Sequence, residues 1–134
     1  MLNKVHHINL LVRDLDSAVE RYRAAFGLDA MEFGELPQRG ARTARFLAGE
    51  TWIVLVQPTD TDGVPARHLA EHGEGLFLLS FGVDSLVDAV AAVEAGGGVV
   101  SSASRAGLDG WRVVDLEPEY FSGASLQLTE DSLP

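Results

Sequence analysis

The sequence predicts an α+β domain built from two tandem βαβββ modules. Three observations predict this class. Strand-like and helix-like runs follow one another in the same order twice, and residues 78–90 match residues 7–19 without a gap. The chain also has 134 residues with 46% hydrophobic content, which suits one domain with a real core. We expect a first module at about 4–58, a linker at 59–75 and a second module at about 76–130.

The first module opens with a short apolar run at 6–12, which predicts a strand. A helix should follow, because Asp14 or Asp16 can cap it and apolar residues then recur at three-and-four spacing as far as Phe26. Gly27 suits the end of that helix. Three further β-like runs complete the module, at 31–33, 41–47 and 51–57.

The linker and the second module continue the same pattern. Prolines, glycines and aspartates mark the linker, which contains a predicted short helix at 66–72. The second module has a strand up to Val83, a helix from Leu86 to Gly96, and three strands, at 99–101, 111–116 and 124–129.

The two halves share little identity, so chance similarity between two helices that follow strands is the simpler explanation. Val12 nevertheless matches Val83, and Leu15 matches Leu86. Because all the elements also match in order, we favour a true duplication.

Composition excludes several classes of protein. The formal charge of −10 disfavours nucleic acid as a partner, since a phosphate backbone requires Lys and Arg. No apolar run is long enough for a membrane span, and no secretory leader is visible, so we expect a cytoplasmic protein without a membrane partner. The absence of cysteine excludes disulfides, thiolate zinc sites and cysteine nucleophiles.

Several motifs resemble the vicinal oxygen chelate superfamily, which includes glyoxalase I, methylmalonyl-CoA epimerase, extradiol dioxygenases and bleomycin-resistance proteins. They are the segment 12–18 (VRDLDSA), the helix end 26–28 (FGL) and the strand opening 73–76 (GEGL). Together with 68–76 and 116–118 (LEP), they look most like the epimerases. The resemblance covers nearly the whole chain and implies a glyoxalase-like fold, in which a curved mixed sheet surrounds a cavity.

The resemblance also implies four metal-ligand positions, and most of them hold unsuitable residues here. His7 occupies the first. Val54 and Leu78 occupy the second and third, and neither has a lone pair to donate. Gln127 occupies the fourth as a neutral, weaker donor. Recruiting Gln57 in place of Val54 would be an odd shift along a strand, which points the side chain to the other face.

The candidate site follows from these positions and from strand alternation. His7 is the best acid–base candidate, with Asp115 or Glu32 as a possible second, although a buried, inert His7 is an equal alternative. His6 should point the opposite way. Thr43 stands where epimerases can carry a glutamate base. The ligand-binding candidates are Asn9, Thr43, Arg45, Trp52, Val54, Leu78, Ser80, Trp111 and Gln127.

These observations predict a metal-independent protein with no cofactor that binds a small organic molecule of polyketide-like or acyl type. It either transforms this molecule by isomerase- or lyase-type acid–base chemistry or sequesters it. One alternative is a drug-sequestering protein of the bleomycin-resistance type. Another is a metal-dependent epimerase or glyoxalase-like lyase with an altered ligand set, including His7 and Gln127. The resemblance also implies a homodimer.

Overall fold

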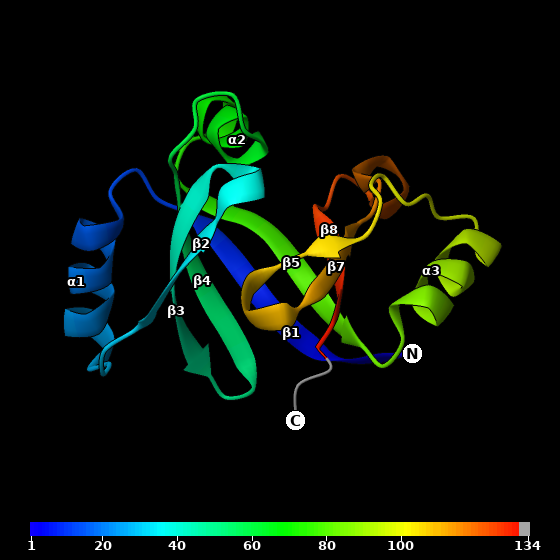
Figure 1. The fold of residues 1–134 in the computed structure, drawn as a ribbon, viewed down its shortest axis with the longest axis horizontal. Coiled ribbons are helices and arrows are strands. Elements are labelled where there is room, and N and C mark those ends of the chain that lie inside the picture. Colours follow the sequence, from blue (N-terminus) through cyan, green and yellow to red (C-terminus); the bar gives the residue numbers. More distant parts are fainter. Residues whose placement is uncertain (132–134) are drawn as a thin grey trace. The chain divides into compact units, whose positions relative to one another are not determined.

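A computed structural model describes residues 1–131 of the chain and contains eight strands and three α-helices (Figure 1). The helices are α1 (Leu15–Phe26), α2 (Val64–His72) and α3 (Leu86–Ala95). The strands are β1 (Leu2–Leu11), β2 (Glu32–Leu36), β3 (Ala41–Ala48), β4 (Thr51–Pro58), β5 (Gly75–Val83), β6 (Arg105–Ala106), β7 (Arg112–Asp115) and β8 (Leu126–Glu130). Short 3-10 turns lie at Pro37–Arg39, Leu108–Gly110 and Pro118–Phe121.

The chain divides into two compact units. The first unit is Ile8–Phe77, and the second joins Met1–His7 to the chain from Leu78 onward. The strand order is β2-β3-β4-β1 in the first unit and β5-β8-β7-β6 along the second half of the chain. In both orders the opening strand of a βαβββ module lies beside its fourth strand, so the two modules share one topology. The division by contacts does not follow the predicted module limits, because residues 4–7 belong to the second unit.

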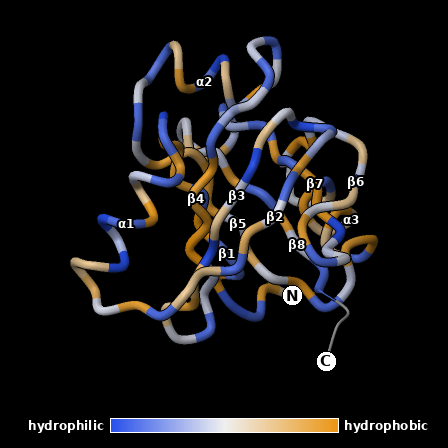
Figure 2. Tube along the Cα trace, turned by 60° about the vertical axis from the view of Figure 1, so that its left-hand side comes forward, coloured by the Kyte–Doolittle hydropathy of each residue, from blue (hydrophilic) through white to orange (hydrophobic). Residues whose placement is uncertain are grey.

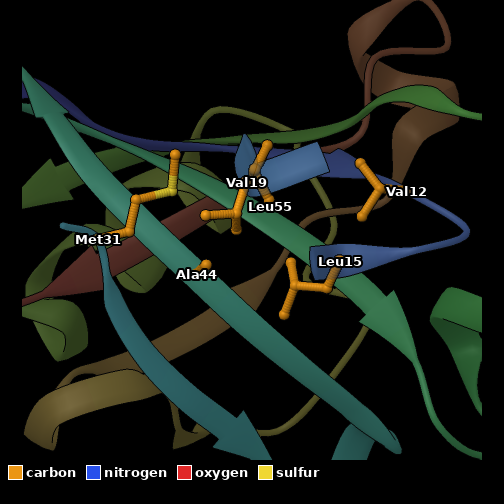
Figure 3. Close-up of a cluster of buried hydrophobic side chains, with 6 residues drawn as sticks. All are labelled: Val12, Leu15, Val19, Met31, Ala44 and Leu55. Atoms are coloured by element: carbon orange, nitrogen blue, oxygen red, sulfur yellow. The ribbon is translucent and has the colours of Figure 1, made fainter. Parts of the chain in front are cut away.

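Helix α1 of the first unit begins and ends where its sequence predicts. The Asp14 carboxylate caps it by accepting a hydrogen bond from the Ser17 backbone N–H, and Gly27 ends it with a left-handed φ of 64°. Its apolar stripe packs against β3 and β4 (Figure 3), and hydrophilic and hydrophobic residues alternate along it in Figure 2. The buried cluster is Val12, Leu15, Val19, Met31, Ala44 and Leu55.

Helix α3 of the second unit repeats this arrangement. The Ser85 hydroxyl caps it by accepting from the Asp88 backbone N–H, at the position that the sequence repeat pairs with Asp14. Its core cluster consists of Val83, Leu86, Ala89, Val114, Leu116 and Leu128.

The strand predicted at 99–101 is wrong. Val100 forms only an isolated bridge with Leu116, and the sixth strand is the two-residue β6. Pairing stops because the Ser102 hydroxyl, instead of a backbone carbonyl, accepts the Asp115 backbone N–H.

Other boundaries differ by a few residues. Strand β1 already begins at Leu2, β2 runs from Glu32 to Leu36, and α2 begins at Val64 with a proline in its first turn. Within residues 1–131, no helix is long and apolar enough to cross a membrane.

Candidate functional site

In the first unit, polar side chains gather on the strand face that α1 leaves uncovered. Ala44 and Leu55 are register partners and pack toward α1. Side chains alternate along a strand, so the neighbouring pairs lie on the other face. These are Arg45 opposite Val54 and Thr43 opposite Val56, and all four side chains are buried.

Arg45 is the charged centre of this face. Its residue is only 8% exposed, its Nη2 donates to Glu32 Oε2 over 2.9 Å, and its guanidinium carbon lies 4.5 Å from the centroid of the Trp52 ring. Two side-chain oxygens, Thr43 Oγ1 and Asn9 Oδ1, are buried without a hydrogen-bond partner among the described residues. The face therefore combines a fixed cation with unsatisfied polar groups.

In the second unit, two histidines meet at Trp111. The ring of Trp111 stacks on His7 and meets His6 edge-on, with centroid distances of 4.9 and 4.5 Å. The His6 and His7 Nδ1 atoms lie 2.9 Å apart, and His6 Nε2 lies 3.0 Å from Asp131 Oδ2. Because the two Nδ1 atoms are in hydrogen-bond contact, the rings turn toward each other, and the expectation that His6 points away from His7 is wrong. The nitrogen–nitrogen hydrogen bond and the shared indole outweigh strand alternation here.

This histidine pair constrains where protons reside. A hydrogen bond between two imidazole nitrogens contains one proton, and a carboxylate accepts from a protonated nitrogen. If His6 donates to Asp131 and is neutral, His7 must donate from Nδ1, which leaves the lone pair of His7 on Nε2. In that tautomer His7 is suited to accept a proton.

Asp115 and Gln127 form a second network in this unit. Arg105 donates to both Asp115 carboxylate oxygens, over 2.7 and 3.2 Å, and Gln127 Nε2 donates to Asp115 Oδ1 over 3.2 Å. Because a carboxylate accepts, these bonds fix the orientation of the Gln127 amide. Its Oε1 is then directed elsewhere and has no hydrogen-bond partner within residues 1–131. Next to this network, Ser80 and Thr129 share a buried hydroxyl–hydroxyl hydrogen bond.

The structure thus groups the predicted residues within each unit. The first unit contains Asn9, Glu32, Thr43, Arg45, Trp52 and Val54, and the second contains His7, Leu78, Ser80, Trp111, Asp115 and Gln127. Sequence reasoning missed the direct partners His6, Arg105, Thr129 and Asp131. Side chains alternate along a strand, so Thr129 could have been predicted on the same face as Gln127, two residues away. Nothing in the sequence pairs His6 with Asp131.

A family model described as the Glyoxalase/Bleomycin resistance protein/Dioxygenase superfamily matches residues 6–114. The chain therefore belongs to this superfamily, and it has the glyoxalase-like fold of vicinal oxygen chelate proteins.

Two solved structures are similar over nearly the whole chain. One is a methylmalonyl-CoA epimerase in complex with methylmalonyl-CoA and ammonium, with 27% identity, 98% of this chain and 96% of the other covered, and a TM-score of 0.91. The other is a variant of the Streptomyces coelicolor epimerase in complex with 2-nitronate-propionyl-CoA. It has 26% identity, coverage of 99% and 100%, and a TM-score of 0.92. An uncharacterized Bacillus subtilis protein is 22% identical over 130 residues, which are 96% of this chain and 93% of that protein.

The residues at the family's metal-ligand positions do not fit a divalent metal. Val54 and Leu78 are buried apolar side chains, and neither has a lone pair to donate to a metal. Gln57 cannot replace Val54, because its Oε1 accepts from the Leu15 backbone N–H at the start of α1. Among residues 1–131, no three His, Asp or Glu side chains gather as a metal site.

Proposed function

We propose that this protein binds a small organic compound of acyl or polyketide-like type without a divalent metal ion, and that it either transforms or sequesters that compound. The observation that carries the proposal is that Val54 and Leu78, at two of the four ligand positions, are buried apolar side chains. His7 and the neutral amide of Gln127 are then the remaining donors at these positions, which is fewer than the three or four ligands that hold a catalytic divalent metal. The acyl-CoA complexes of the structural relatives support an acyl ligand.

In the enzyme version, His7 is the acid–base residue. Its stacking on Trp111 and its hydrogen bond to His6 hold the ring in one orientation, and the tautomer described above gives Nε2 the lone pair of a general base. The ligand-binding residues are those predicted from the sequence. Asp115 and Glu32 are weaker candidates for the second acid–base role, because each is ion-paired with an arginine.

The test combines metal analysis with binding. Protein purified without chelator should contain no stoichiometric metal. Isothermal titration with methylmalonyl-CoA and propionyl-CoA as probes should give the same Kd, within about twofold, in EDTA and in cobalt. His7→Ala should lower the rate of any turnover without releasing metal, whereas His72→Ala, which alters an exposed histidine on α2, should leave both turnover and metal content unchanged.

Stoichiometric cobalt, nickel, zinc or iron that is lost in His7→Ala would contradict the proposal and favour a metal-dependent epimerase or lyase. A probe that binds tightly and returns unchanged would favour sequestration. We further infer a homodimer in the cytoplasm, and a monomer in light scattering would refute the dimer.

A further inference from the structure

Three side chains of the second unit connect the buried acid–base candidate to the surface. His7 and His6 are 3% and 1% exposed, whereas the Asp131 side chain is 25% exposed. His7 Nδ1 lies 2.9 Å from His6 Nδ1, and His6 Nε2 lies 3.0 Å from Asp131 Oδ2. Both are hydrogen-bond distances. The contacts therefore form a continuous path from a buried imidazole to a carboxylate that water can reach.

Trp111 holds the buried part of this path in place. Its indole stacks on the His7 ring and meets the His6 ring edge-on, with centroid distances of 4.9 and 4.5 Å. The indole offers both rings an apolar surface where water would otherwise lie. The two imidazoles consequently keep their mutual hydrogen bond, and each has a second ring nitrogen through which a proton can enter or leave.

The two ends of the path differ in how well they tolerate charge. An imidazolium at His7 would be a buried cation, which is costly without a counter-ion. At the other end, Asp131 supplies a negative charge against His6 and is itself partly hydrated. A proton that His7 accepts is therefore more stable when its charge is passed toward Asp131.

We propose that His7, His6 and Asp131 form a proton relay between the buried site and solvent. In the tautomer described above, His7 accepts a proton at Nε2. The proton on His7 Nδ1 moves to His6 Nδ1, the proton on His6 Nε2 moves to Asp131 Oδ2, and Asp131 releases it to water. One proton enters and one leaves, so neither imidazole retains a positive charge.

The relay changes His7 from a base into an acid. After the transfer, His7 has its proton on Nε2 and its lone pair on Nδ1, so the same nitrogen that accepted a proton can next donate one. This inference rests on the enzyme version of the proposed function. It adds His6 and Asp131 as positioning residues, which act through His7.

The experiment measures how fast the imidazole N–H protons of His6 and His7 exchange with water. Magnetisation transfer from water is followed by NMR on histidine-labelled protein in EDTA, with backbone amide exchange in β8 as the internal reference. We expect Asp131→Asn to slow imidazole exchange at least about tenfold, because an amide cannot accept and release the proton. Asp131→Glu should keep the exchange rate within about threefold of the wild-type rate, because it retains a carboxylate.

A purely structural role for Asp131 predicts the opposite change. Loss of its hydrogen bond would loosen the histidine pair, expose the N–H groups to water and speed their exchange. Asp84→Asn is the matched control, because Asp84 is an exposed aspartate of the same unit that accepts from the Asn3 side chain, and it should leave imidazole exchange unchanged. Faster or unchanged exchange in Asp131→Asn would overturn the relay.

The ring-nitrogen NMR signals of the wild-type protein provide a test that needs no variant. We expect protons on His7 Nδ1 and His6 Nε2 in the ligand-free protein, and an unprotonated His6 Nε2 would overturn the relay. Both measurements are made without metal or ligand. A metal requirement in the acyl-CoA titrations would overturn the proposed function without changing either result, so the two failures are distinguishable.

Discussion

Ser80 and Thr129 satisfy each other's hydroxyl groups at a place where water has no access, since both residues are 0% exposed. Thr129→Val should leave the Ser80 hydroxyl unpaired and destabilise the protein by about 1–3 kcal/mol. Ser80→Ala should have a similar effect. The double variant should cost less than the sum of the two, because it removes both polar groups.

Urea denaturation followed by circular dichroism measures these changes. Ser104→Ala serves as the control, because Ser104 is exposed, and its free energy of unfolding should change by less than about 0.5 kcal/mol. Additive single effects would mean that the two hydroxyls do not depend on each other.

Individual residues show what the alternation of side chains along a strand can and cannot predict. Strand periodicity placed Thr43, Arg45 and Gln127 on the faces that the helices leave free, and the register agrees. It failed for His6, because this side chain contacts Trp111, which directly precedes β7, and Asp131. Both residues are far from His6 in the sequence.

At the scale of elements, both modules solve the same problem at the start of their helix. The first helical N–H of α1, on Leu15, donates to Gln57 Oε1, and that of α3, on Leu86, donates to Glu130 Oε1, each over 2.8 Å. Both acceptors stand near the end of the fourth strand of their module. Because helix N-termini need acceptors, this shared solution supports duplication more strongly than sequence identity does.

Helix α2 carries a pH-sensitive histidine. Burial lowers the pKa of His68, and the nearby His72 lowers it further, while Glu71 raises it. The unfolded chain therefore binds a proton to this histidine more readily than the folded protein does. Its stabilising contribution should be complete above the ordinary histidine pKa of about 6.5 and should be lost as the pH falls below that value.

Substitutions of the two neighbours should move this pKa in opposite directions. His72→Gln should raise the pKa of His68, and Glu71→Gln should lower it further. The NMR titration of the His68 ring proton measures both. Shifts of the same sign in the two variants would contradict the electrostatic explanation.

At the scale of the whole molecule, the net charge of −10 governs long-range encounters. It should prevent binding to duplex DNA, because too few cations are present to release the counterions of the phosphates. Fluorescence anisotropy with a labelled duplex at about 50 mM salt should show no binding, and a complex that weakens as salt is raised would contradict this expectation.

The sequence by itself determined the two modules, their helices and the apolar residues at two metal-ligand positions. These features depend on local periodicity and on residue type, and both can be read directly from the sequence. Only the tertiary structure decided which groups meet. It brought His6 to His7 and Asp131, placed Arg45 opposite Val54, and left the Thr43 hydroxyl without a hydrogen-bond partner among residues 1–131. Such contacts join distant strands, and their energies depend on burial and on the distance between charges, which no local pattern specifies.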